Sequence, residues 1–136
     1  QGELEVSSIN TGVPHAILFV AEADQAMVGP LGRELRFHEH FKPKGTNVNF
    51  VQPLDAHTIR VRTYERGVEG ETLACGTGVC ASAIISHLAG RVAPPVKVRV
   101  QGGDTLEVDF KVTGGEIRDV TLQGPADFVF EGTIPI

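Results

Sequence analysis

Residues 75–90 read CGTGVCASAIISHLAG, and this stretch decides the fold. It predicts a helix, because Ala81, Ile84, Ile85 and Leu88 follow the i, i+3, i+4, i+7 spacing of one helical face. The stretch contains no Asp, Glu, Lys or Arg, and small residues fill most other positions. Such a composition is typical of a helix that is buried on nearly all sides. Gly90 favours the end of the helix at this point.

Four apolar or alternating runs before this helix predict strands. They cover residues 3–9, 16–20, 47–52 and 57–64. Between the second and third of these runs, Leu31 and Leu35 are spaced i, i+4 behind Pro30. This spacing predicts a short helix over residues 29–40.

The residues after the central helix predict an antiparallel meander of three or four strands. The expected strands cover residues 96–101, 105–110, 116–122 and 128–130, with glycine-rich turns between the first three. One helix enclosed by seven or eight strands is an α+β fold. We expect a curved mixed or antiparallel sheet around one buried central helix, with the short helix outside. Residues 1–136 are expected to form a single domain.

Composition and charge exclude several function classes. Of the 136 residues, 41% are apolar and 21% are charged, and the net charge is −5. The basic residues are dispersed, Trp is absent and there is one Tyr, so we expect no nucleic-acid partner. No apolar run approaches the ~20 residues that a membrane-spanning helix needs, so we expect no membrane partner.

The two cysteines, Cys75 and Cys80, indicate a reduced, cytoplasmic protein. Two are too few for a disulfide scaffold, and their spacing does not match a zinc site. On one helix they would lie about 140° apart around the axis, which disfavours a bridge between them. We interpret Cys80 as a small buried apolar side chain.

The start of the predicted central helix is the candidate site. The first N–H groups of a helix lack intrahelical partners and carry the positive end of the helix dipole. Gly76 and Gly78 would let an anion approach these groups. The same position favours the thiolate of Cys75. Just upstream, Glu65 and Arg66 could hold the amine and the carboxylate of a zwitterion. From physics alone, a glycine-rich cap beside a solvated ion pair explains these residues equally well.

The segment from Glu65 to Gly78 resembles the second catalytic motif of the diaminopimelate epimerase family. Four further segments resemble other C-terminal segments of that family, in the same order along the chain. They are GVPH at residues 12–15, GRELR at 32–36, GTNVNF at 45–50 and LQGPA at 122–126. The resemblance covers essentially the whole chain. It implies the C-terminal half of a two-half enzyme in which each half is a curved sheet around a central helix.

The resemblance also implies an activity. The family consists of isomerases of lysine biosynthesis that interconvert LL- and meso-diaminopimelate without pyridoxal phosphate, another cofactor or a metal. One cysteine thiolate removes the α-proton and a second thiol returns it from the opposite face. A planar carbanion needs such an acid and base on opposite sides, and a thiol can serve as either near neutral pH. This chain would supply one of the two, Cys75.

Further site residues follow from the same resemblance. Gly76 and Thr77 would hold the reacting carboxylate with their backbone. Asn47, Glu65 and Arg66 would bind the distal end of the substrate. His15 would orient the thiols or share a proton with them; its alternative interpretation is a core histidine bonded to backbone.

Several features depart from the family pattern. Val13 stands where Asn is usual, so the resemblance does not extend to one distal-end contact. Asn49 stands where Gly is frequent, and the loop at residues 67–71 is one residue longer than the commonest form. The chain begins at Gln1 and its only methionine is Met27. We therefore expect a fragment or processed product that lacks the N-terminal half, and is inactive or nearly so alone. The intact enzyme is expected to be a homodimer.

Two alternatives stay open. The first is half of a related cofactor-independent racemase that acts on proline or hydroxyproline. Such relatives usually carry Asp-Arg-Ser-Pro before Cys-Gly-Thr-Gly, where this chain has ETLA at residues 71–74. The second is a non-catalytic binding module of the same fold, in which Cys75 is structural and unreactive.

Overall fold

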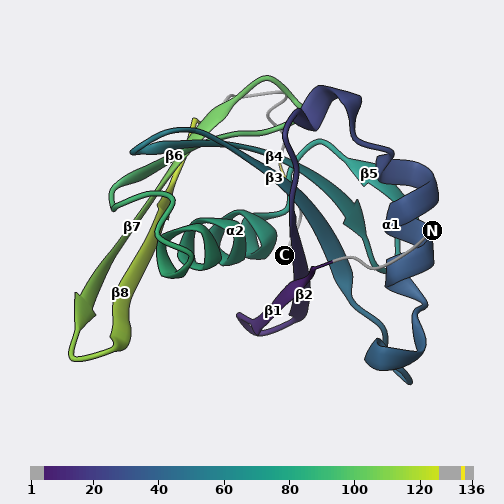
Figure 1. Cartoon of the computed structure of the whole chain (residues 1–136). Helices are drawn as coiled ribbons and strands as arrows, with labels where there is room; N and C mark the ends of the chain where they lie inside the picture. The colour runs from purple at the N-terminus through teal and green to yellow at the C-terminus, as the bar shows by residue number, and fades with distance from the viewer. Residues whose placement is uncertain (1–4, 126–132, 134–136) are drawn as a thin grey trace.

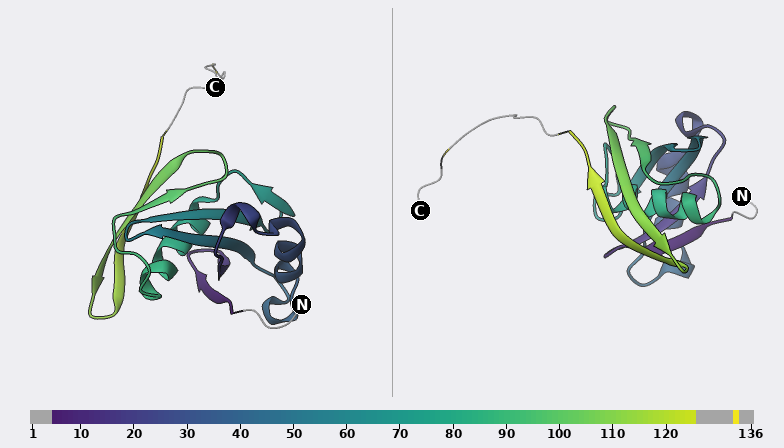
Figure 2. Two further views of the ribbon diagram at one scale, coloured as in Figure 1. Left: turned by 45° about the horizontal axis from the view of Figure 1, so that its top comes forward. Right: turned by 90° about the vertical axis from the view of Figure 1, so that its left-hand side faces the viewer.

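The computed structural model describes residues 5–125 and residue 133. In this part of the chain, eight strands form one curled mixed sheet with the order β1-β2-β3-β4-β6-β7-β8, and β5 pairs with β4. The pairs β2–β3 and β4–β6 are parallel. Helix α2 lies inside the curl, and helix α1 lies on the other side of the sheet (Figure 1). The views in Figure 2 show the same enclosure of α2 from two further directions. The expected α+β fold is confirmed.

The bounds of the elements are as follows. The strands are β1 (Ser7–Asn10), β2 (Pro14–Phe19), β3 (Asn47–Asp55), β4 (Thr58–Glu65), β5 (Gly70–Thr72), β6 (Val96–Arg99), β7 (Thr105–Thr113) and β8 (Glu116–Gln123). The helices are α1 (Val28–Arg36) and α2 (Gly76–Leu88), with short 3-10 turns η1 (Ala23–Gln25) and η2 (Glu39–Phe41).

Strand alternation gives the sheet two apolar faces, and each face buries a different helix. On the inner face, Ile17, Val51 and Val61 belong to one core cluster with residues of α2 such as Val79. On the outer face, neighbours of these residues form a second cluster with α1. Its fully buried members are Leu18, Val28, Leu35, Val48, Phe50 and Tyr64. A strand covered on both faces explains why residues 16–19 of β2 read as a continuous apolar run rather than as an alternating one.

Helix α2 confirms the predicted central helix. It ends where Gly90 predicted: Gly90 has φ +75°, and the N–H groups of Gly90 and Arg91 donate to the carbonyls of His87 and Ser86 at 2.9 Å each. The predicted burial is confirmed for the body of the helix, where residues 78–87 are all buried or half-buried; exposure is confined to its ends, where Leu88 is 61% exposed and Gly76 and Thr77 are exposed. The sheet covers the middle of α2 and leaves both ends uncovered.

Several predicted boundaries need correction. Helix α1 ends at Arg36 instead of residue 40, because His38 is extended and its side chain accepts the N–H of His40, which starts the turn η2. Strand β5 was not predicted; it has three residues and no apolar alternation. The strand expected at residues 128–130, and residues 3–4 of the first expected strand, lie outside the described residues.

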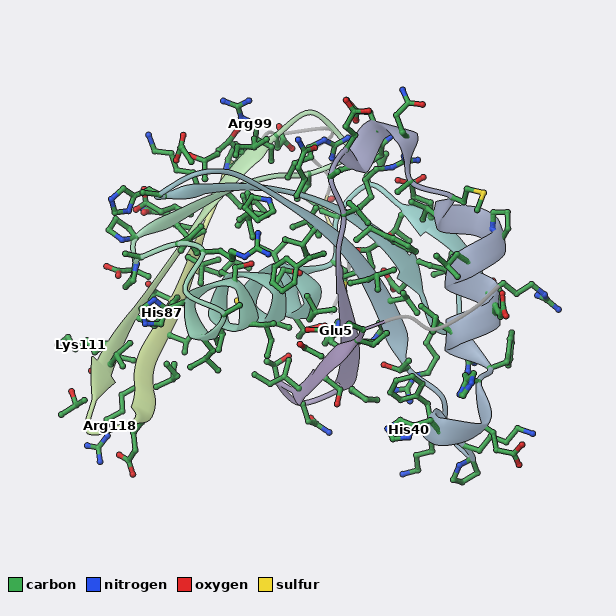
Figure 3. The ribbon with its side chains drawn as sticks, in the orientation of Figure 1. Glu5, His40, His87, Arg99, Lys111 and Arg118 are labelled. Atoms are coloured by element: carbon green, nitrogen blue, oxygen red, sulfur yellow. The ribbon has the colours of Figure 1, made fainter. Side chains whose placement is uncertain are left out.

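The C-terminal meander β6–β7–β8 is antiparallel, as predicted. Gly114 and Gly115 form the turn between β7 and β8, where Thr113 pairs with Glu116. Lys111 and Arg118 lie toward the free end of this hairpin (Figure 3). The other end of β8 returns to the start of α2, where Leu122 contacts the position of Gly76.

A glycine substitution in α1 tests the packing of this helix on β4. A Cβ at Gly32 would lie 2.6 Å from the Cβ of Tyr64, which is too close to relieve by turning the ring. We expect Gly32→Ala to lower the free energy of unfolding by about 1–3 kcal/mol. Gly29→Ala is the matched control: a Cβ there meets nothing within 4 Å of the described structure. Because Gly29 precedes Pro30, which disfavours helical backbone at a residue with a Cβ, this change should alter the free energy of unfolding by less than about 1 kcal/mol in either direction. Urea denaturation measures the free energy of unfolding of both variants, and equal effects would contradict the close packing of α1 on β4.

Candidate active site

The inner face of the sheet changes from apolar to polar below the first turn of α2. On β3, Asn49 lies two residues before Val51 and therefore on the same face. Thr63 on β4 pairs directly with Asn49, and Ile17 of β2 registers with Asn49 on its other side. His15 lies two residues before Ile17 on that face. His15 and Asn49 are both 0% exposed. Two residues along each strand, the inward-facing side chains thus change from the apolar core to a buried polar cluster.

Helix α2 begins directly on this polar cluster. A Cβ at Gly78 would lie 2.6 Å from Oδ1 of Asn49 and 3.2 Å from Cε1 of His15. The sequence analysis interpreted Gly78 as room for an anion, but the structure gives another reason: only a glycine lets the helix approach these two side chains. Gly76 is exposed, as an anion-binding residue would need to be.

Cys75 occupies the N-cap of α2 with extended backbone, at φ −134° and ψ 110°. Within residues 75–79, which the structure describes, no side chain caps the helix and none is acidic. The first N–H groups therefore stay available to a ligand, and the helix dipole adds positive character to them. Cys75 is half-buried and its thiol is free. Its Sγ lies 3.6 Å from Oγ1 of Thr77.

His15 reaches the thiol through Thr77 rather than directly. Its Nε2 lies 2.9 Å from Oγ1 of Thr77, so one hydroxyl stands between the imidazole and the sulfur. Burial, and to a smaller extent the positive charge of Arg66, lower the pKa of His15 to about 4. His15 is therefore neutral near pH 7. The alternative of a core histidine bonded to backbone does not match these contacts, since both ring nitrogens face side chains.

Asn47, Glu65 and Arg66 form a second group at the same edge of the sheet. Oδ1 of Asn47 accepts the backbone N–H of Arg66 at 2.7 Å, and its Nδ2 donates to the carbonyl of Pro14 at 3.1 Å. Glu65 is the last residue of β4 and is half-buried. Asn47 is thus held by backbone on two sides and positions Arg66. Its direct contact with a substrate, like those of Glu65 and Arg66, stays a prediction.

The loop after Arg66 is held by two ion pairs. Nη2 of Arg36, on α1, lies 2.9 Å from a carboxylate oxygen of Glu69. Arg62 makes a two-pronged contact with Glu71, with distances of 2.6 and 2.7 Å, and this ion pair raises the pKa of Arg62. These contacts occupy Glu69 and Glu71, so the chain that follows the tip of the longer loop is anchored to α1 and β4.

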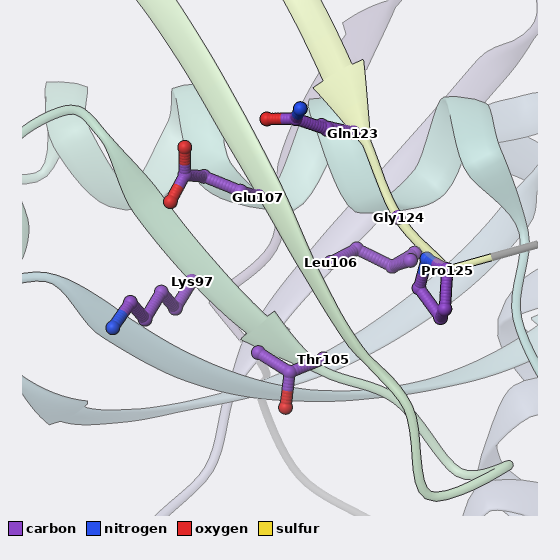
Figure 4. Close-up of a pocket in the computed structure, with 7 residues that line it drawn as sticks. All are labelled: Lys97, Thr105, Leu106, Glu107, Gln123, Gly124 and Pro125. Atoms are coloured by element: carbon purple, nitrogen blue, oxygen red, sulfur yellow. The ribbon is translucent and has the colours of Figure 1, made fainter.

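An open apolar hollow of about 520 Å³ borders the thiol site on the inner side of the sheet. It is lined by Thr11, Gly76, Thr77, Cys80, Ile84, Val120 and Leu122. Cys80 lies here half-buried, and burial raises the pKa of its thiol. Figure 4 shows a separate hollow of about 320 Å³ near the C-terminal end of β8. None of the candidate site residues lines the hollow in Figure 4.

Two site features were missed from the sequence alone. Asn49 was noted as a departure from a family pattern, and Thr63 was not singled out. The available signal was the Asn-x-Asn spacing of residues 47 and 49, which places two amides on one face at the start of a predicted strand.

Among the residues with described placement, no cluster of three or more His, Cys, Asp or Glu could hold a metal ion. No helix in the described part is long and apolar enough to span a membrane.

Comparison with known proteins gives consistent matches. A family model described as diaminopimelate epimerase matches residues 7–129. The chain is 54% identical to the diaminopimelate epimerase of Aquifex aeolicus (strain VF5), with 93% of this chain and 44% of that protein covered. It is 44% identical to that of Methanocella arvoryzae, with 97% and 45% covered. The chain spans about half the length of the curated relatives it matches.

Solved structures show the same fold at low identity. A PhzF-family phenazine biosynthesis protein of Bacillus anthracis matches with a TM-score of 0.55 and 20% identity, over 84% of this chain and 37% of that chain. A PhzF-family protein of Enterococcus faecalis matches with a TM-score of 0.54 and 18% identity, over 74% and 35%. These likenesses support the curled sheet around a central helix.

The lowered pKa of His15 predicts a specific loss of stability in acid. The pKa is about 4 in the folded chain and 6.5 when unperturbed, so between these values the unfolded chain binds more protons. The free energy of unfolding should therefore fall as the pH falls from about 6.5 to 4, by up to about 3 kcal/mol. Urea denaturation at pH 7.5 and 4.5 measures this loss. His15→Gln should lose less over the same interval; an equal loss in both proteins would contradict the assignment.

Proposed function

This chain belongs to the diaminopimelate epimerase family, and we propose that it supplies one of the two thiols with which the full-length protein interconverts LL- and meso-diaminopimelate. The family supports an epimerase role. The observation that carries the specific proposal is the position of Cys75 at an uncapped, solvent-accessible helix start. There the thiol stands beside backbone N–H groups suited to hold a carboxylate.

The proposed reaction needs two things at the α-carbon. A base must remove its proton, and the negative charge that develops next to the carboxylate must be stabilised. The Cys75 thiolate serves as the base in one direction, and the protonated thiol serves as the acid in the other. The N–H groups of Gly76 and Thr77 bind the reacting carboxylate. The positive end of the α2 dipole then stabilises the charge as it moves toward the carboxylate.

The distal end of the substrate is assigned to the second group of residues. Glu65 would bind the distal ammonium and Arg66 the distal carboxylate. Asn47 would assist by holding the Arg66 backbone in place, which its 2.7 Å hydrogen bond supports. His15, neutral and bonded to Thr77, would orient the residues around the thiol.

The second thiol and the second face of the site are proposed to come from an N-terminal half. Apolar side chains around Cys75 support this: Leu73 is 71% exposed, Leu122 44% and Val120 43%. Apolar surface gathered beside a site is typical of an interface. A partner half seated there would exclude water from Cys75 and bring its own cysteine to the opposite face of the α-carbon. The 136-residue chain, as one domain, would then be inactive or nearly so alone.

Exchange of the α-hydrogen tests the proposal. Diaminopimelate is incubated in deuterium oxide with the full-length protein that carries this chain, and deuterium incorporation is followed by mass spectrometry. Cys75→Ser should reduce the exchange rate of the epimer whose α-hydrogen faces Cys75 by a factor of about 10² or more, because a serine hydroxyl is a far weaker base and acid than a thiol here.

The matched control is Cys80→Ala, which removes the other thiol of the same helix. It should retain exchange, because Cys80 lies a turn further along α2 and packs against the core. Equal retention of exchange in both variants would contradict the role of Cys75. Exchange with proline in place of diaminopimelate would favour the related racemase instead.

A further inference from the structure

The side-chain amide of Asn49 is oriented unambiguously by its neighbours. One amide atom lies 3.3 Å from the carbonyl oxygen of Ala16, which can only accept a hydrogen bond, so this atom is Nδ2. The other lies 2.9 Å from Oγ1 of Thr63, whose hydroxyl donates to it as Oδ1. The reverse orientation would set two acceptor oxygens against each other at Ala16.

This orientation determines which nitrogen of His15 carries the proton. Nδ2 of Asn49 also lies 3.0 Å from Nδ1 of His15. Because Nδ2 can only donate, Nδ1 must present its lone pair, and the neutral imidazole carries its hydrogen on Nε2. Nε2 then donates to Oγ1 of Thr77, which lies 2.9 Å away.

The same series of hydrogen bonds extends to the sulfur of Cys75. Oγ1 of Thr77 accepts from His15, so the hydroxyl hydrogen of Thr77 is left to donate elsewhere. Sγ of Cys75, 3.6 Å away, is the partner that the structure offers it. A thiolate accepts such a bond, and a hydrogen bond to the charged form favours that form. Every donor in the series from Thr63 to Thr77 thus points toward Cys75.

We propose that Asn49 is a positioning residue, which holds neutral His15 in the Nε2–H form and thereby directs the Thr77 hydroxyl to the Cys75 sulfur. This inference rests on the proposed role of Cys75. Asn49 itself is fully buried and touches no solvent. In this state His15 acts on the thiol as a fixed donor through Thr77, and it does not take the thiol proton itself.

The burial of this polar cluster supports a role for Asn49 beyond packing. A buried amide or imidazole without a hydrogen-bond partner is destabilising, and an apolar residue such as Val51, two positions along the same face, would fill the space without that cost. Asn49 instead satisfies three neighbours from β2 and β4 at once. Gly78 brings the helix start to the same side chain.

The tautomer of His15 is the direct test, and it needs no substrate. In the ¹⁵N NMR spectrum of the full 136-residue chain at pH 7, protonated and unprotonated ring nitrogens have distinct shifts. The His15 signals are those lost in His15→Gln. We expect unprotonated Nδ1 and protonated Nε2. A proton on Nδ1 in the wild-type chain would overturn the proposal.

Two variants separate positioning from packing. Asn49→Ala removes the donor to Nδ1, so His15 should populate both tautomers and Cys75 should react with iodoacetamide about two- to tenfold more slowly. Val51→Ala, the next inward residue of β3, removes packing but leaves the tautomer and the Cys75 rate unchanged. Identical tautomers and Cys75 rates in the two variants would overturn the proposal. A wrong tautomer with intact substrate exchange contradicts only this inference, whereas the expected tautomer without exchange contradicts only the proposed function.

Discussion

The contact between the first turn of α2 and the polar end of the sheet is the constraint on which the site depends. Gly78 approaches Asn49 and His15 so closely that any side chain at this position would collide with them. That contact fixes where the helix begins. It follows that Thr77 lies against His15 and that Cys75, two residues earlier, lies at the edge of the buried region with its backbone extended.

The sheet supplies this constraint through simple alternation. One face of β2, β3 and β4 carries Ile17, Val51 and Val61 below the body of α2. On the same face, below the first turn, the inward residues are His15, Asn49 and Thr63. The apolar rows hold the helix in place by burial, and the polar residues orient its start by hydrogen bonds. A rigid core beside a directional polar cluster is what a proton-transfer site requires, since reacting groups must be held to a fraction of an ångström.

Much of the fold was predictable because its signals are local. The run from Cys75 to Gly90 predicted the central helix and its end, and paired glycines predicted the hairpin turns. Strand β5 and the end of α1 were not predictable, because they depend on pairing with β4 and on one side-chain bond of His38. The role of Asn49 needs the parallel register of β2 and β3, which brings residues 15, 16 and 49 together. No periodic pattern within a single strand encodes that register.

The proposed role of Cys75 requires that the start of α2 attract a carboxylate to the thiol. The most direct measurement compares the rates at which Cys75 reacts with iodoacetate, an anion, and with iodoacetamide, its neutral analogue, with mass spectrometry separating Cys75 from Cys80. The net charge of −5 should make iodoacetate the poorer reagent elsewhere on the chain. We expect a higher ratio of the iodoacetate rate to the iodoacetamide rate at Cys75 than at a small free thiol such as glutathione. A ratio equal to or below that of the free thiol would contradict an anion-binding helix start at this cysteine.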